Sequence, residues 1–314
     1  MPLTEPIVFE PLFMERVWGG RRLESLYGKR LPEGHPIGES WEIVDRDDAQ
    51  SVVREGALRG ATLHELWVGR RAEIFGGGLP ETERFPLLFK LLDAQDRLSV
   101  QVHPPDDVAA RFGGEPKTEM WYFLDTLPGS DLYAGLKRGV TRADFEHALV
   151  AGHVADLINR LPSHAGDAFF IPTGRVHAIG AGNVIFEVQQ NSDTTYRVFD
   201  WNRVGLDGKP RALHLAESLA SINFDDPEPG VVERRGELVV ECKFFRVEQW
   251  SLLAPRACGS GAFAVFAVEH GAVSCGGRMF GAGECFAVPA GWTDAEWVPR
   301  APETTVLRTT VHAR

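Results

Sequence analysis

Short apolar runs, separated by clusters of glycine, proline and aspartate, are the main pattern along this chain. Runs of this length and of this β-branched and aromatic content are typical of strands that end at tight turns. The runs that carry this prediction are residues 86–94, 98–102, 120–124, 168–172, 184–190, 244–250, 263–269 and 285–289. We therefore expect a mainly β protein.

A few segments have the pattern of helices instead. Thr62 and Glu65 have the spacing of a capping box, and Thr141 and Asp144 repeat this spacing with aspartate in place of glutamate. Apolar residues then recur at near-helical intervals. The predicted helices follow Thr62 as far as residue 75, cover residues 142–160 as one or two helices, and cover residues 212–221.

The segment GDAFFIPTGRVHAIGAG contains the spacing G-x5-P-x-G-x2-H, formed by Gly166, Pro172, Gly174 and His177. Glycine and proline at these positions predict a strand, a tight turn and a return strand. His177 then begins the return strand with its imidazole directed inward. This pattern suggests a polar site enclosed by β-strands.

The same frame recurs near the C-terminus, at Gly283, Pro289 and Gly291. The position that matches His177 is Asp294, and no Gln-x-His strand precedes this second copy. A repeated frame predicts two related domains, of which only the first keeps the histidine. Chance is the competing explanation, because glycine is abundant in this chain.

An acidic, proline-rich stretch at residues 225–230 is the best candidate for a linker between these domains. We therefore expect a catalytic, metal-binding domain at residues 1–226 and a degenerate domain without metal at residues 227–314. A length of 314 residues agrees with two domains.

The charge and composition of the chain indicate which binding partners and which cellular compartment to expect. The net charge of −11 argues against nucleic acid or an anionic membrane as the main partner. No run reaches the roughly 20 apolar residues of a membrane helix, and the N-terminus lacks the pattern of a signal peptide. We expect a cytoplasmic protein. Its four cysteines form no C-x2-C pair, so we expect reduced thiols.

Four polar residues could converge on a metal ion. Gln101 and His103 are two apart and would share one face of a strand. Glu119 and His177 would complete a set of nitrogen and oxygen donors, which favours zinc over manganese, iron or cobalt. Taken singly, each could instead end a strand, bond within a turn or lie on the surface.

Three cations and one carboxylate accompany this set. Lys90 interrupts an apolar run, Lys117 precedes Glu119 by two residues, and Arg197 lies among aromatic residues. They could line a basic pocket that binds a phosphate or stabilises developing negative charge, or they could form ordinary ion pairs. Glu187, in a strand near His177, could transfer a proton or orient a metal ligand.

These motifs together resemble the type I phosphomannose isomerase family, in its short bacterial form. The resemblance covers essentially the whole chain. It rests on ERVWGGRRL, FKLLDAQDRLSVQVHP, GGEPKTEMWYFLD and FFIPTGRVHAIGAGNVIFEVQQNSDTTYRVFDWNR. One departure is Val17, which stands where the eukaryotic type has an aspartate before Trp18.

The resemblance implies two cupin jelly-roll barrels with a few helices inserted in the first. It implies interconversion of mannose 6-phosphate and fructose 6-phosphate through an enediol or enediolate, with one zinc ion per chain. By residue-wise match, the zinc ligands would be Gln101, His103, Glu119 and His177. The other active-site residues would be Lys90, Lys117, Glu187, Arg197 and Trp18.

The roles of the active-site residues stay open at this point. The base could be Glu187, or a neutral Lys117 whose pKa a nearby metal lowers. Arg197 would stabilise the enediolate or bind the phosphate, while Lys90 and Trp18 would contact the substrate. A homodimer is possible. The competing functions are an iron-dependent cupin oxygenase and a non-catalytic carbohydrate-binding cupin.

Overall fold

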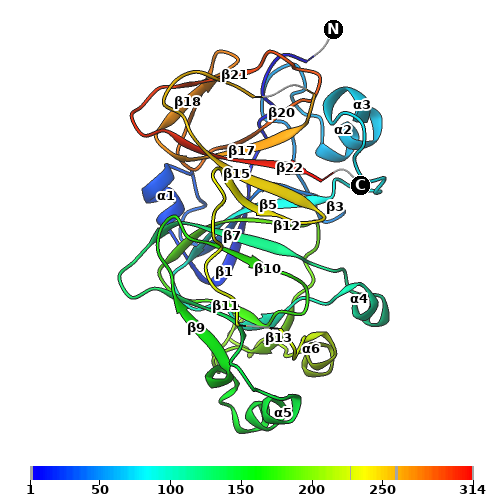
Figure 1. Ribbon diagram of the computed structural model, residues 1–314, viewed down its shortest axis with the longest axis vertical. Coiled ribbons are helices and arrows are strands. Elements are labelled where there is room, and N and C mark those ends of the chain that lie inside the picture. The colour runs from blue at the N-terminus through cyan, green and yellow to red at the C-terminus, as the bar shows by residue number, and fades with distance from the viewer. Residues whose placement is uncertain (1–2, 227, 259–260, 313–314) are drawn as a thin grey trace.

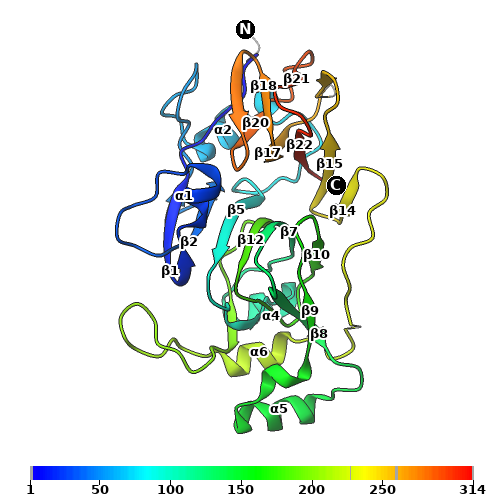
Figure 2. The same ribbon diagram turned by 90° about the vertical axis from the view of Figure 1, so that its left-hand side faces the viewer.

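The computed structural model describes residues 3–226, 228–258 and 261–312. Its strands form two double-sheet units that are stacked along the long axis of the molecule (Figure 1 and Figure 2). Strands from residues 12–199 make the lower unit in both views, and strands from residues 238–311 make the upper unit. The expectation of a mainly β protein is confirmed.

The first unit consists of a six-stranded and a five-stranded antiparallel sheet. The six-stranded sheet has the order β1 (Leu12–Gly20), β2 (Ile37–Ile43), β5 (Leu87–Ala94), β12 (Asn183–Gln190), β7 (Glu119–Thr126) and β10 (Ala168–Ile171). The five-stranded sheet has the order β13 (Tyr196–Phe199), β6 (Val100–Val102), β11 (His177–Ile179), β8 (Asp131–Leu136) and β9 (Ile158–Pro162). A separate two-stranded ribbon pairs β3 (Asp45–Arg46) with β4 (Ala49–Gln50).

The second unit has the same two-layer plan with shorter strands. Its five-stranded sheet has the order β14 (Leu238–Glu241), β15 (Phe245–Ser251), β22 (Thr305–Val311), β17 (Ala264–His270) and β20 (Cys285–Val288). Its four-stranded sheet has the order β16 (Arg256–Ala257), β21 (Glu296–Pro299), β18 (Ala272–Cys275) and β19 (Arg278–Gly281). Each of the eight predicted apolar runs overlaps one of these strands.

In the described part of the chain, six short α-helices and one 3-10 helix accompany the sheets. They are α1 (Arg22–Tyr27), α2 (Leu63–Gly69), α3 (Arg71–Ile74), α4 (Asp106–Phe112), α5 (Arg142–Ala151), α6 (Leu215–Ser221) and the 3-10 helix η1 (Val154–Leu157). Both predicted capping boxes are present, at Thr62 with Glu65 and at Thr141 with Asp144. No described helix is long and apolar enough to cross a membrane.

The predicted helical segment at 142–160 is wrong in its last part. The helix ends at Ala151, because Gly152 adopts a left-handed conformation with φ of 77°. One 3-10 turn follows, and Ile158 then begins β9. The sequence pattern misled here because a strand and a helix both bury apolar residues. The apolar residues of β9 therefore looked like a continuation of the helix.

The strands on either side of the Pro172–Gly174 turn are not a hairpin. β10 pairs with β7 in the six-stranded sheet, whereas β11 pairs with β6 and β8 in the opposite sheet. The turn therefore carries the chain from one layer to the other. The turn of the repeated frame near the C-terminus also carries the chain between layers. The strand before it, β20, pairs with β17, and the strand after it, β21, belongs to the other sheet of the second unit.

The two units share one hydrophobic core. A single cluster of buried side chains includes Leu91 and Phe186 of the first unit together with Phe263 and Leu307 of the second. The N-terminal segment joins both, because Ile7 pairs with Ala287 of β20. The four cysteines are free, as expected. Residue 227, where the expected second domain begins, lies outside the described residues.

A buried ion pair lies close to this shared core. Lys29 Nζ is 2.7 Å from Glu42 Oε1, and both side chains are almost fully buried. Ser40 Oγ also donates to Glu42 Oε1, at 2.5 Å. The pair lies near Cys285 of β20, where burial and then the charge on Glu42 raise the pKa of the thiol.

Replacing Glu42 should strongly destabilise the fold. Glu42→Ala leaves the ammonium group of Lys29 buried without its partner, and we expect a loss of about 3–5 kcal/mol in the free energy of unfolding. Urea denaturation followed by circular dichroism measures this loss. As a matched control, Glu146→Ala breaks the exposed pair with Arg142 and should cost no more than about 0.5 kcal/mol. Equal effects would contradict the prediction.

Candidate metal centre and active-site cavity

The six-stranded sheet carries a row of four polar and aromatic side chains across its inner strands. In the strand register, Lys90 lies opposite Trp41 on one side and opposite Glu187 on the other. Glu187 in turn lies opposite Trp121 of β7. Residues that are directly opposite in antiparallel strands point to the same face. The row therefore places a cation beside a carboxylate, with an aromatic ring at each end.

The facing five-stranded sheet carries a second row. Gln101 of β6 lies opposite His177 of β11 on one side and opposite Arg197 of β13 on the other. These residues are far apart in the sequence, and only the register brings them together. Lys90 and Glu187 of the first row line one wall of a cavity, and Gln101 and Arg197 of the second row line the other.

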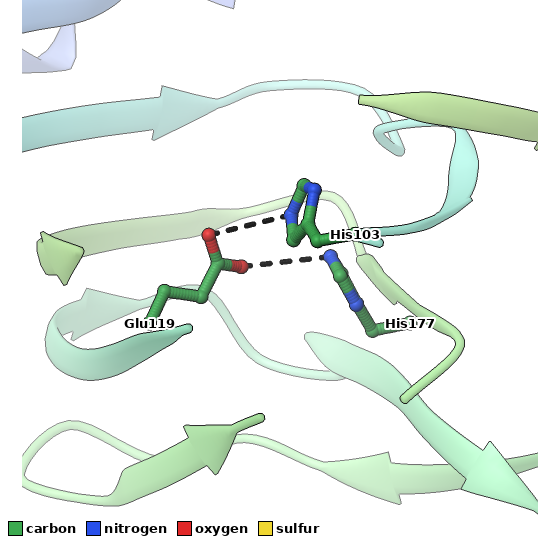
Figure 3. A group of neighbouring side chains, drawn as sticks. All are labelled: His103, Glu119 and His177. Atoms are coloured by element: carbon green, nitrogen blue, oxygen red, sulfur yellow. Dashed lines mark ion pairs between the residues drawn. The ribbon is translucent and has the colours of Figure 1, made fainter. Parts of the chain in front are cut away.

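His103, Glu119 and His177 converge between these walls (Figure 3). His103 follows the end of β6, Glu119 begins β7 and His177 begins β11. His103 Nε2 is 3.4 Å from one carboxylate oxygen of Glu119, and His177 Nε2 is 3.5 Å from the other. Gln101 Nε2 is 3.2 Å from His177 Nε2. All four predicted ligands are therefore neighbours.

The hydrogen bonds of the two imidazoles fit a metal-binding role. His103 Nδ1 donates to the carbonyl of Thr194 at 2.9 Å, and His177 Nδ1 donates to the carbonyl of Arg175 at 2.8 Å. Both Nε2 atoms are then left as lone-pair donors. His103 Nε2 and Glu119 Oε1 are buried without a hydrogen-bond partner among the described residues. A divalent cation would satisfy them.

Burial and neighbouring charges set the protonation states that such a cation needs. Burial, reinforced by the other histidine, lowers the pKa of His177 to about 3. Burial also lowers the pKa of His103. Burial alone would raise the pKa of Glu119, but Lys117 and the two imidazoles hold it well below its usual range. The ligands are thus two neutral imidazoles and one carboxylate.

Two lysines lie beside this cluster, and each has a carboxylate partner. Lys117 Nζ is 2.8 Å from Glu119 Oε2, and Lys90 Nζ is 3.3 Å from Glu187 Oε1. Burial disfavours the charged form of Lys117, but Glu119 and Glu187 outweigh this effect and raise its pKa. Burial and the charge of Glu119 raise the pKa of Glu187, which also accepts a hydrogen bond from Trp121 Nε1 at 3.0 Å.

The cavity between the two walls has a volume of about 530 Å³. Six of the predicted site residues line it, namely Trp18, Lys90, Gln101, Lys117, Glu187 and Arg197. Arg197 Nη1 donates to the carbonyl of Ala212 at 3.0 Å, whereas its Nε is buried without a partner among the described residues. The other three predicted residues, His103, Glu119 and His177, are buried and do not line the cavity, but Gln101 adjoins both the cavity and His177.

Several lining residues were missed by the sequence reasoning. Arg16 and Glu39 form an ion pair of 2.7 Å on the wall that carries Lys90. Arg211, paired with Asp200, and the turn at 205–207 reach the cavity from the segment between β13 and α6. No local motif marks these positions, because charged residues in strands and loops are usually exposed to solvent.

The second unit holds no comparable cluster among the residues that the structure describes. Its interior is filled by aromatic rings: Phe266 packs 4.3 Å from Trp297 between ring centroids, and Phe280 packs 3.9 Å from Phe286. Asp294, which matches His177 in the repeated frame, is exposed. Aromatic packing therefore occupies the interior of the second unit at the level where the first unit carries its polar cluster.

Comparison with known proteins agrees with these features. A model of the catalytic domain of type I phosphomannose isomerases matches residues 8–121. Mannose-6-phosphate isomerase ManA of Bacillus subtilis is 41% identical over 258 residues, which cover 79% of this chain and 80% of that protein.

Solved structures match over almost the full length. The crystal structure of the mannose 6-phosphate isomerase from Bacillus subtilis superimposes with a TM-score of 0.86 at 30% identity, covering 97% of this chain and 99% of the other. A mannose 6-phosphate isomerase crystallised with zinc and yttrium has the same fold, with a TM-score of 0.75 at 16% identity over 98% of this chain and 99% of the other. The chain belongs to the type I phosphomannose isomerase family of enzymes.

Proposed function

We propose that this protein is a zinc-dependent isomerase that interconverts mannose 6-phosphate and fructose 6-phosphate. The observation that carries the proposal is a cavity that borders the metal-ligand cluster through Gln101 and Lys117. Its wall also carries Arg197, an arginine without a carboxylate partner among the described residues. The names of the relatives supply the substrate. We also propose that the two double-sheet units are two cupin domains, and that the first is the catalytic one.

His103, Glu119 and His177 would hold the zinc ion, with Gln101 as the fourth ligand. The amide oxygen of Gln101 must then face the ion, which needs only a half-turn of the carboxamide from its present orientation. When bound, zinc supplies a Lewis acid for the oxygens at C1 and C2 of the sugar. An ion with these ligands keeps coordination positions for oxygens of a substrate.

Glu187 is our candidate for the group that moves the proton between C1 and C2. Its raised pKa brings it closer to the operating pH of a general base, and Trp121 and Lys90 fix its orientation. Lys117 is less suited to this role, because the carboxylates around it raise its pKa and keep it a cation. We assign Lys117 to holding Glu119 in place and to offsetting negative charge.

Arg197 is our candidate for the residue that binds the phosphate. The cavity is lined by five cations, and four of them already have carboxylate partners: Arg16 with Glu39, Lys90 with Glu187, Lys117 with Glu119, and Arg211 with Asp200. Arg197 has no carboxylate within ion-pair distance among the described residues. An incoming phosphate would supply the missing charge and accept from its free Nε.

Removal of zinc should abolish turnover. We expect the purified protein to carry one zinc ion per chain and to form fructose 6-phosphate from mannose 6-phosphate in a coupled assay. A chelator should stop the reaction, and added zinc should restore it, because turnover would depend on an ion held by these ligands. Absence of turnover in zinc-loaded protein would overturn the proposed function. Oxygen consumption by an iron-loaded form would favour the oxygenase instead.

Arg197→Ala should lower kcat/KM by roughly 10²–10³-fold, because a charge-assisted contact with the phosphate is lost. The zinc content should stay at the wild-type level, since the side chain of Arg197 makes no hydrogen bond or ion pair to His103, Glu119 or His177 in the described part of the chain. Arg197→Lys should recover part of the activity. Steady-state kinetics and metal analysis test this, with Arg142→Ala as a remote arginine control. Near-wild-type turnover would remove Arg197 from the mechanism.

Glu187→Gln should lower kcat by roughly 10²–10⁴-fold with little change in KM, because a general base is lost while the shape of the side chain is kept. Zinc should be retained. Lys117→Gln should instead weaken zinc binding through its contact with Glu119. Zinc titrations and kinetics on both variants separate the roles. If Glu187→Gln kept its kcat while zinc-loaded Lys117→Gln lost it, the two assignments would be reversed.

A further inference from the structure

Glu39 is a carboxylate on the cavity wall that the proposed chemistry does not use. It lies on β2, opposite Leu92 of β5, which places it two residues along the strand from the row that contains Lys90. Two residues of a strand span roughly 7 Å. Glu39 is therefore on the same face as Lys90 and Glu187, but displaced from the proposed reacting centre.

Only one oxygen of Glu39 is used within the protein. Arg16 Nη2 donates to Oε2 at 2.7 Å, and Trp41 Nε1 donates to the same oxygen at 2.9 Å. Oε1 accepts no hydrogen bond within the described part of the chain, although the residue is 8% exposed and lines the cavity. Two donors on one oxygen fix the carboxylate and leave the other oxygen available to a ligand.

The surroundings keep Glu39 ionised. Burial alone would raise the pKa of Glu39, but Lys90 and then Arg16 outweigh burial and lower it. An ionised carboxylate accepts hydrogen bonds and cannot donate one. The only donors on a sugar phosphate are its hydroxyl groups, because the phosphate and the carbonyl group accept. Oxygen Oε1 is thus suited to a hydroxyl and would repel the phosphate.

Trp41 links Glu39 to the proposed reacting centre. Its indole N–H holds Glu39, while Lys90 Nζ lies 5.1 Å from the centre of its ring. The same aromatic side chain therefore positions a carboxylate at one edge and a lysine over one face. A shift of Trp41 would therefore displace both the carboxylate of Glu39 and the ammonium group of Lys90.

We propose that Glu39 is a substrate-binding residue that accepts a hydrogen bond from a sugar hydroxyl between the reacting carbons and the phosphate. Arg16 and Trp41 are positioning residues that hold it for this contact. The inference rests on the proposed function and deepens it, because it names a residue that recognises the hydroxyls of the sugar chain. A site built around a hydroxyl discriminates strongly against an analogue without that group.

The test compares Glu39→Gln with wild-type enzyme on fructose 6-phosphate and on its 3-deoxy and 4-deoxy analogues. We expect Glu39→Gln to lower kcat/KM for fructose 6-phosphate about 10- to 100-fold, as loss of a hydrogen bond to a charged group does. On one of the two deoxy analogues, the kcat/KM of the wild-type enzyme should fall by a similar factor relative to fructose 6-phosphate. On that analogue, Glu39→Gln should lower kcat/KM little further. If Glu39 had only a structural role, the substitution would lower kcat/KM by the same factor for all three substrates.

The positioning residue gives an independent readout. Arg16→Met should also lower kcat/KM for fructose 6-phosphate. Arg16→Lys should restore most of the lost kcat/KM. Zinc content and melting temperature should stay near the wild-type values. If Glu39→Gln does not fold, Glu39→Asp and Arg16→Met carry the same test, because each displaces oxygen Oε1 from its position.

Glu24→Gln is the matched control. Glu24 lies on α1, forms an exposed ion pair with Arg21 and does not line the cavity. It should leave kcat/KM within about twofold for all substrates, as ordinary surface substitutions do. Wild-type activity in Glu39→Gln, or equal loss on every analogue, would overturn the inference while leaving the isomerase function intact. Inactive, zinc-loaded wild-type enzyme would instead overturn the proposed function itself.

Discussion

The carboxylate of Glu119, buried between two imidazoles and the ammonium group of Lys117, is the interaction on which the site depends. A buried carboxylate is costly unless cations or hydrogen-bond donors surround it. Here its oxygens face side chains from two opposed sheets. The two layers must therefore pack so that these polar groups meet, because the buried carboxylate of Glu119 is stable only in contact with them.

The layers divide the polar groups between two walls. One wall carries the lysine–glutamate row with its two tryptophans, and the other carries Gln101, His177 and Arg197. The crossing at Pro172–Gly174 is what places β10 in one layer and β11 in the other. A hairpin at this point would have kept His177 on the same sheet as Glu119, where the two could not face one another between the layers.

The second unit shows how the same plan behaves without a polar site. Its two-layer interior is filled by Trp297 and several phenylalanines, and its five-stranded sheet packs on the first unit through a shared core. Burial of these aromatic rings stabilises the second unit. Its contribution to the first unit is physical support, because it buries the face of the six-stranded sheet that is turned away from the cavity.

The β class and both capping boxes could be predicted from the sequence alone, because they depend on local spacing that the backbone converts directly into geometry. The four candidate metal ligands were predicted from two short spacings together with the family resemblance, and strand register is what brings these residues together. Prediction from the sequence failed at residues 152–160, where one glycine ended a helix that the apolar pattern seemed to continue. Only the tertiary structure decided that Arg16 and Glu39 reach the cavity, and that Arg197 alone among its cations has no carboxylate partner in the described chain. The reason is that strand register and the facing of two sheets set these pairings, and no local pattern encodes which distant segment becomes a neighbour.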